Sequence, residues 1–302
     1  MPIFWMRQIL LRKPVCHNVP VMLYGSMPID NGNLSLTPEE KNKLLAVEPE
    51  SAPYIRNYMG GDEFLNGIER YCIWLSDCPP DVLRRLPKLL EHVEKNRIYR
   101  LSSDRETTRQ LADKAALFGE IRQPAESFLF IPKVSSENRK FLPIGYCLPN
   151  IIASGSALII PAAKLFHFGI LSSTMHNAWM RAVCGRMKSD YQYSASIVYN
   201  NFPWPEPTTA QKKVIETAAQ LILDARLLYP NSTLADLYDP VTMPPELVKA
   251  HQKLDKAVET AYGKTDFKTE AERVAFLFER YQQISAPLIP MIEAKKRKSK
   301  LR

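Results

Sequence analysis

Short apolar runs separated by turn residues fill the first eighty positions of the chain. Clusters of Gly, Pro, Asn and Asp interrupt these runs, a pattern typical of strands joined by turns. The best strand candidates are VPVMLYG at 19–25 and RYCIWLS at 70–76. In the second candidate both alternating faces are apolar, which predicts a strand that is buried on both sides.

From Asp81 the apolar positions recur at helical spacing. Asp81 is a suitable N-cap, and Leu83 and Leu86 would share one face of the helix that follows it. Pro87 is suited to begin a new helical turn instead. We therefore expect a helical section over 81–117 that contains two helices. Its arginines form either a solvated helix face or a set of phosphate contacts, and they stand at positions 84, 85, 97, 100, 105 and 109.

Strand-like segments return after residue 126, with SFLFIPKV, KFLPIGYC and ALIIPAAKLFHF as the candidates. A helix is expected next in SSTMHNAWMRAVCGR, where Ser172 or Ser173 provides the N-cap and Gly185 ends the helix. The three prolines of FPWPEP, at 202–207, exclude a regular helix. This segment predicts a domain boundary.

Helical periodicity dominates the last hundred residues. Thr208 and Gln211 fit a capping box, and the apolar stripe of their helix runs from Val214 to Leu228. Start and stop signals predict two more helices, from Pro244 to Gly263 and from Thr269 to Ile284. Three amphipathic helices with short links predict a small bundle.

These patterns predict an α+β fold. A mixed, mainly antiparallel β domain with helices would occupy residues 1–205, and a small C-terminal helical bundle would occupy residues 206–290. Residues 291–302 are expected to form a disordered basic tail.

Net charge adds little to this picture. The chain of 302 residues carries a formal charge of +8, but KKRKSKLR at its end contributes six positive charges, which leaves +2 for the remainder. DNA binding therefore has to be argued from local arrangement. No apolar run is long enough to span a bilayer, and Arg7 interrupts the apolar N-terminus. We expect a cytoplasmic protein without membrane contact.

The sequence carries no recognisable catalytic or metal-binding pattern. The five cysteines include no CxxC pair, so no disulfide framework or zinc site is expected. GxGxxG, Walker A, GxSxG and HExxH are absent, and so is the Asp/Asn/Ser-Pro-Pro-aromatic tetrad of amino-methyltransferases. Glu293-Ala294-Lys295 matches a nuclease ExK fragment by coincidence. A nucleophilic pair drawn from His167, His176 and Cys184 is a weaker interpretation than structural roles for all three.

One segment is suited to binding. In GRMKSDYQYS, at 185–194, the polar residues Lys188, Asp190 and Gln192 alternate with Tyr191 and Tyr193. A single extended strand would place the three polar side chains on one face and the tyrosines on the other. Two interpretations remain open, a polar recognition surface and a solvated strand edge.

Several blocks resemble one family. GSMPIDNGNLSLTPEEK, KVSSENRKFLPIGY and LFHFGILSSTMHNAWMRAVCGRMKSDYQYSASIVYNNFPWPEP resemble the target-recognition region of MmeI-like restriction–modification enzymes, and YeeA-type DNA methyltransferases are similar. The resemblance implies a target-recognition domain followed by a C-terminal helical domain, with double-stranded DNA as the partner. It also implies a methyltransferase domain, in the same polypeptide or in a split partner, which binds S-adenosylmethionine and methylates adenine N6. An intact enzyme with a nuclease would also use Mg²⁺.

The resemblance further implies that Lys188 and Asp190 read one base pair. Chemistry is consistent with this role, because lysine donates to guanine O6 and N7 and a carboxylate accepts from cytosine N4. Four other residues fall near reading positions of the family: Lys133, Gly155, Ser156 and Gln192. Gln192 is suited to adenine, whereas Gly155 lacks the side chain expected opposite Lys133.

Two arginines flank the end of the predicted helix over 172–186. Arg181 and Arg186 would hold DNA phosphates or cap helix carbonyls. The rival functions for the whole chain are a protein-interaction module and an independent enzyme that uses His167, His176 or Cys184. Apart from that last rival, we expect no catalytic residue, cofactor site or metal site in the chain.

Overall fold

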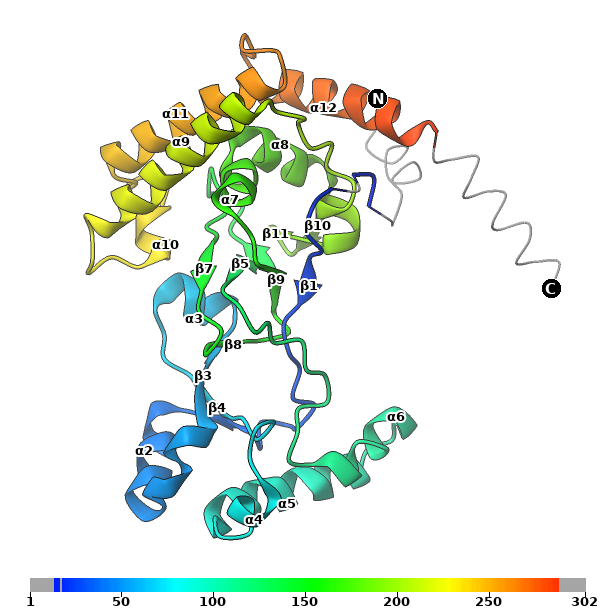
Figure 1. The fold of residues 1–302 in the computed structure, drawn as a ribbon, viewed down its shortest axis with the longest axis vertical. Helices are drawn as coiled ribbons and strands as arrows, with labels where there is room; N and C mark the ends of the chain where they lie inside the picture. Colours follow the sequence, from blue (N-terminus) through cyan, green and yellow to red (C-terminus); the bar gives the residue numbers. More distant parts are fainter. Residues whose placement is uncertain (1–13, 17, 288–302) are drawn as a thin grey trace, which may run out of the picture. The chain divides into compact units, whose positions relative to one another are not determined.

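A computed structural model describes residues 14–16 and 18–287 of the chain. The basic tail, Arg7 and Glu293-Ala294-Lys295 lie outside the described residues. The chain divides into two compact units. The first comprises residues up to Met22, Lys133–Gly145 and the residues from Ala162 onward, and the second comprises Leu23–Pro132 and Tyr146–Pro161. Figure 1 labels most of their helices and strands.

The second unit contains two four-stranded sheets. The first has the order β1 (Leu23–Tyr24), β9 (Ala157–Pro161), β5 (Phe128–Pro132), β7 (Gly145–Cys147), and both β1 and β5 pair with β9 in antiparallel fashion. Every residue of β5 is buried. The prolines at the ends of β5 and β9 stop the strands, since proline cannot donate to a ladder.

The second sheet has the order β2 (Ser35–Leu36), β4 (Tyr71–Ile73), β3 (Ile55–Met59), β8 (Ile152–Ala153). Its pairs are antiparallel except β3 with β8, which is parallel. Cys72 and Ile73 on successive positions of β4 are both fully buried, so the prediction of a strand buried on both faces is confirmed. α2 (Pro38–Val47) follows β2, η1 (Pro49–Tyr54) precedes β3 and α3 (Gly61–Asn66) follows it.

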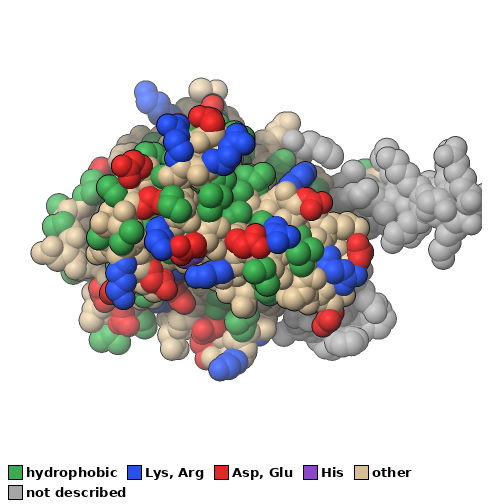
Figure 2. Space-filling view, turned by 90° about the horizontal axis from the view of Figure 1, so that it is seen from below, with side chains coloured by type: hydrophobic (Ala, Val, Ile, Leu, Met, Phe, Trp, Pro, Cys, Tyr) green, Lys and Arg blue, Asp and Glu red, His purple; other side chains and the backbone are tan. Residues whose placement is uncertain are grey.

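The helical section of the second unit begins with α4 (Pro80–Leu83), whose N-cap is Pro79 and not Asp81. Pro87 begins a new helix, α5 (Pro87–Leu101), because proline at a first turn needs no N–H partner. The second predicted helix is reduced to α6 (Glu106–Arg109) and the 3₁₀ turn η2 (Ala112–Lys114). On the face seen in Figure 2, basic and acidic side chains are interspersed.

Four of the six arginines of this section, Arg85, Arg97, Arg100 and Arg109, have side-chain contacts within the protein. Arg97 forms two hydrogen bonds with Glu94 on the same helix. Arg100 is fully buried, and its guanidinium donates five hydrogen bonds, all to backbone carbonyl oxygens. The acceptors belong to Pro28, Ile29, Leu111, Lys114 and Leu117. A phosphate-binding role for Arg100 is therefore excluded, because no donor is left for a ligand.

The first unit contains a three-stranded antiparallel sheet, with the order β10 (Gly185–Met187), β11 (Asp190–Gln192), β6 (Val134–Ser135). α7 (Leu165–Ser172) covers the sequence LFHF, which we expected to continue a strand. That expectation is wrong, because the strand stops at Pro161 and Lys164 starts a helix as its N-cap residue. η3 (Ala195–Tyr199), a π-helical turn, follows β11.

α8 (Thr174–Val183) begins as predicted, with the Ser173 hydroxyl accepting from the His176 backbone N–H. Gly185 does not end this helix. The chain is already extended at Cys184, and Gly185 opens β10. The correction places the start of the GRMKSDYQYS segment inside a sheet.

Four helices complete the first unit: α9 (Thr209–Leu227), α10 (Leu234–Leu237), α11 (Pro245–Ala261) and α12 (Glu270–Ser285). The capping box of Thr208 and Gln211 is confirmed. Val214 and Leu228 are 57% and 62% exposed, so the predicted stripe is wrong at both ends, and Ile215 and Ile222 lie in the core. α9 packs against α11 and α7, and α12 packs against α8 (Figure 1).

The α+β class is confirmed. Among the described residues, no helix is both long and apolar enough to cross a bilayer.

Candidate nucleic-acid interface

GRMKSDYQYS folds as a tight hairpin and not as one strand. β10 and β11 pair through Gly185 with Gln192 and Met187 with Asp190, which leaves Lys188 and Ser189 as the two turn residues. Lys188 has φ of 55°, as the first position of a mirror-image hairpin turn requires. The prediction of one shared strand face is therefore wrong for Lys188. The turn still brings Lys188 and Asp190 to the same tip, by a different route.

The tyrosines fix this hairpin to the protein. Tyr191 and Tyr193 are buried, as predicted for the apolar face of β11. Nδ1 of His176 lies 3.1 Å from the Leu171 carbonyl oxygen, and a carbonyl only accepts, so Nδ1 carries the proton. Nε2 then accepts from the Tyr193 hydroxyl at 3.0 Å. This chain of hydrogen bonds connects Tyr193, directly after β11, to α8 and α7.

Burial lowers the pKa of His176 to about 3 and raises that of Tyr193. Both groups are neutral at physiological pH, and their bond is a structural one. His167 accepts from the Lys164 backbone N–H at 3.0 Å, and burial lowers its pKa to about 4. Burial also raises the pKa of the Cys184 thiol, which keeps it protonated. The geometry thus gives His167, His176 and Cys184 structural positions.

Polar groups remain available at the hairpin tip. Lys188 is exposed, while Asp190 and Gln192 are partly exposed on one face of β11. The loop after β6 contacts this tip, since the Glu137 backbone N–H donates to Asp190 Oδ1 at 3.4 Å. The tip presents one ammonium donor and one carboxylate acceptor on a short, anchored support.

Arg186 stiffens the turn. Its Nη1 donates to the Ser189 carbonyl oxygen at 2.6 Å and lies 3.3 Å from Glu137 Oε2, while its guanidinium carbon stands 4.1 Å from the centre of the Tyr191 ring. Arg181 forms two hydrogen bonds with the carboxylate of Glu270 and a third with the Lys140 carbonyl. These three bonds occupy three of the five N–H donors of Arg181, and the Glu270 carboxylate already neutralises its charge.

The other predicted reading residues fall in both units. The Lys133 carbonyl accepts from the Tyr193 N–H at 2.8 Å, and Gln192 pairs with Val134, so both belong to the hairpin sheet and its margin. Gly155 and Ser156 belong to the second unit. A side chain at Gly155 would come within 2.3 Å of Met27 Cγ, so Met27 occupies the room that a reading side chain would need.

The C-terminal helices support the loop beside the hairpin. Arg226 of α9 donates to the Ile144 carbonyl at 2.8 Å, and the His251 ring of α11 stacks on Phe141 with ring centres 3.9 Å apart. The Asn177 side chain of α8 accepts from the Leu142 N–H at 2.8 Å. Side chains of α8, α9 and α11 therefore contact the segment that follows β6 and reaches Asp190. No pattern in the sequence predicts these contacts.

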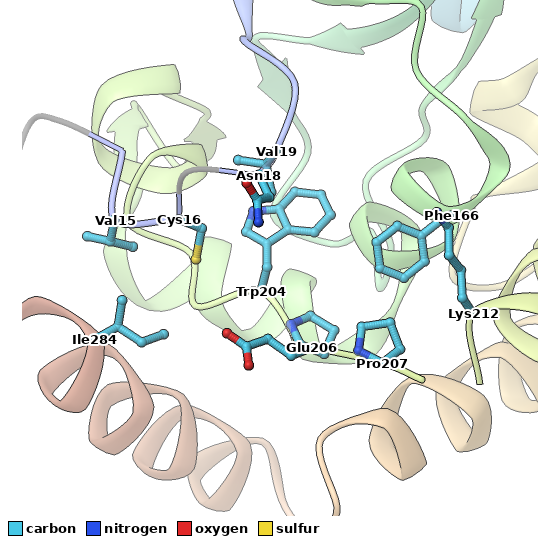
Figure 3. Close-up of a pocket in the computed structure, with 11 residues that line it drawn as sticks. Val15, Cys16, Asn18, Val19, Phe166, Trp204, Glu206, Pro207, Lys212 and Ile284 are labelled. Carbon is cyan, nitrogen blue, oxygen red and sulfur yellow. The ribbon is translucent and has the colours of Figure 1, made fainter. Parts of the chain in front are cut away.

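A separate hollow of about 460 Å³ lies in the first unit (Figure 3). In this view Trp204 lies between Cys16 on one side and Phe166 and Lys212 on the other. Burial raises the pKa of the Cys16 thiol. The described lining is largely aromatic, aliphatic and proline, with one glutamate and one lysine, so it lacks the clustered cations expected of a phosphate site.

The residues predicted from the sequence do not include Arg139, which lies near the hairpin tip on the loop that contacts Asp190. Its only signal is its place in SSENRK, a polar stretch between two strand candidates. Within residues 14–16 and 18–287, no group of three or more His, Cys, Asp or Glu residues is arranged to hold a metal ion.

Comparisons with known proteins identify the family to which the chain belongs. The profile of the MmeI target recognition domain matches residues 9–206, and that of the MmeI C-terminal domain matches residues 207–289. DNA methyltransferase A of Bacillus subtilis (strain 168) is 38% identical over 273 residues, which are 90% of this chain and 31% of that protein.

A solved structure agrees. The Type IIL restriction-modification enzyme MmeI, in complex with DNA, superposes with a TM-score of 0.89 at 48% sequence identity, over 92% of this chain and 37% of that one. The chain thus spans about a third of the length of either relative. It belongs to the MmeI family, and it corresponds to the target recognition domain followed by the C-terminal domain.

Proposed function

We propose that this chain is the specificity portion of an S-adenosylmethionine-dependent DNA adenine-N6 methyltransferase or restriction–modification enzyme. Residues 1–205 would recognise a sequence in double-stranded DNA, and residues 206–290 would either help clamp the duplex or brace the recognition domain. Binding of S-adenosylmethionine, base flipping and methyl transfer would belong to a methyltransferase domain in the same polypeptide or in a split partner.

The observation that carries the proposal is the hairpin tip. A two-residue turn is narrow enough to enter a major groove, which admits a two-stranded ribbon. The tip carries an exposed Lys188 donor and, two residues on, the Asp190 acceptor. Such a pair matches the two edges of a G·C pair, because Lys donates to guanine and Asp accepts from cytosine N4. Tyr193, His176 and Arg186 fix the support, which favours reading over loose contact.

The test exchanges the charges. The 302-residue chain and its Lys188→Glu/Asp190→Arg variant are each incubated with randomised duplex DNA at two salt concentrations, and the retained DNA is sequenced. We expect an enriched motif with a fixed G·C pair for the unaltered chain and an inverted preference, at that position alone, for the variant. The swap keeps one charge of each sign, so non-specific attraction should change little.

Three outcomes would count against the proposal. An unchanged base preference in a variant that still binds would remove Lys188 and Asp190 from the reading site. Retention without enrichment, lost at high salt, would reduce the activity of the isolated chain to phosphate contact. No retention at either salt would favour a protein-interaction module.

A further inference from the structure

Arg139 differs from the other arginines around the hairpin. Arg181, Arg186 and Arg226 each donate at least two hydrogen bonds to protein acceptors. Arg139 is partly buried, yet its guanidinium has no hydrogen-bond acceptor or ion-pair partner among the residues that the structure describes. A guanidinium has five N–H donors. Its donors are therefore suited to an acceptor from outside the chain.

Arg139 lines a hollow of about 340 Å³. Ser136, Asn138 and Arg139 line it from the loop after β6, and Asp239 and Pro240 line it from the turn after α10. All five residues belong to the first unit. Four of these five residues are polar or charged and the hollow is open to solvent, which suits a charged group that keeps part of its hydration.

Among residues 14–16 and 18–287, no carboxylate forms an ion pair with Arg139. Burial lowers the pKa of the Arg139 guanidinium, and the carboxylates of Asp190 and Asp239 oppose that effect from a distance. Asp239 Oδ1 already accepts from the backbone N–H groups of Val241 and Thr242, which holds this carboxylate in its own turn. Arg139 stays cationic at any physiological pH.

The position of Arg139 relates it to the reading tip. Two residues before it on the same loop, the Glu137 N–H donates to Asp190 Oδ1. A duplex whose base edges met Lys188 and Asp190 would bring its phosphates to the margin of the hairpin, since the groove walls are formed by the backbones. An arginine at this margin can grip two phosphate oxygens at once.

On the basis of the proposed function, we propose that Arg139 donates to a DNA phosphate that flanks the base pair read by the hairpin tip. The contact fixes the register of the hairpin on the duplex without selecting sequence. Asp239 weakens this contact by repulsion, so its carboxylate limits the affinity of the site.

The test measures the salt dependence of binding. A labelled duplex of random sequence is titrated with the 302-residue chain, and with Arg139→Gln, Arg139→Lys, Asp239→Asn and Arg97→Gln variants, over a series of salt concentrations. The Arg97 variant loses the same charge from an exposed helix of the second unit, and the basic tail is common to all of them.

We expect Arg139→Gln to reduce the slope of log affinity against log salt by about 1 and to weaken binding at low salt roughly tenfold. Arg139→Lys should recover most of the slope, Asp239→Asn should bind as tightly or more tightly, and Arg97→Gln should behave as the unaltered chain. In the selection experiment the base preference of Arg139→Gln should be unchanged.

An Arg139→Gln slope equal to that of the unaltered chain would overturn the Arg139 contact and leave the proposed function intact. A changed base preference at unchanged slope would also overturn it, by making Arg139 a base reader or a positioning residue for Asp190. Failure of the unaltered chain to bind the duplex would overturn the proposed function, and the Arg139 contact with it.

Discussion

Two arginines, one in each unit, are both shielded from solvent but differ in their hydrogen-bond partners. Arg100 is fully buried, and five backbone carbonyl oxygens accept from it at 2.8–3.1 Å. Arg139 is only partly buried and has no such acceptor among the described residues. In both cases burial removes hydration from the guanidinium and thereby lowers its pKa. The difference shows that the count of occupied donors, and not positive charge, separates a structural arginine from a candidate ligand-binding one.

The largest expected effect comes from breaking the Arg100 site. Arg100→Met should lower the free energy of unfolding by about 3 to 5 kcal/mol, because several carbonyl groups would lose their donor in the interior. Arg139→Met should change it by less than about 1 kcal/mol, because no internal hydrogen bond is lost. Urea unfolding followed by circular dichroism measures both. Equal losses in the two variants would show that occupied donors do not separate the two arginines.

A smaller effect should follow from acidification. His176 resembles Arg100 in having its polar atoms occupied inside the protein, but it is held neutral. Its pKa is about 3 in the folded protein against 6.5 normally. The unfolded chain therefore binds the proton first, and stability is lost as pH falls below about 6.5. By about pH 5 this histidine alone should lower the free energy of unfolding by about 2 kcal/mol.

A His176→Gln variant isolates that contribution. The variant should be less stable than the unaltered chain at about pH 7.5, because Gln cannot reproduce both hydrogen bonds. Between about pH 7.5 and about pH 5 it should lose about 2 kcal/mol less than the unaltered chain. Parallel losses in the two proteins would mean that His176 does not titrate differently on unfolding.

The smallest effect is expected at the hairpin tip, which lies beside the loop that carries Arg139. Lys188→Gly should raise the free energy of unfolding by about 0.5 kcal/mol, since glycine adopts a positive φ without strain. The same change should abolish the preference for G·C in the duplex selection. Ser189→Gly is the matched control: Ser189 lacks a positive φ, so its replacement should not stabilise. A stabilised variant with unchanged base preference would show that the Lys188 amine reads no base.

Local patterns predicted some elements well. The capping residues Thr208 and Ser173 were found from the sequence because a cap bonds within three residues of itself. The burial of Tyr191 and Tyr193 followed from the period of a strand. The strand expected over LFHF was wrong because short apolar runs fit helix and strand equally well.

Local sequence patterns predicted only part of the candidate site. Alternation correctly put Asp190 and Gln192 on one face of a strand, but it carried that strand through Lys188, where the chain turns. A two-residue turn without Gly or Asn has little local signal, and the pairing of Met187 with Asp190 decides it. The family resemblance supplied the pair Lys188 and Asp190, and the fold showed how both reach the tip.

The sequence by itself determined the fold class, the family, the main helix caps and the polar composition of the hairpin, because these depend on neighbours within a few residues or on similarity along the chain. Only the tertiary structure decided that Arg100 is a structural element and that the guanidinium of Arg139 has no acceptor within the described part of the chain. The acceptors of Arg100 at Pro28 and Ile29 lie 72 and 71 residues away along the chain. A hydrogen bond depends on distance in space, and no local pattern records which carbonyl groups the fold will bring to a given side chain.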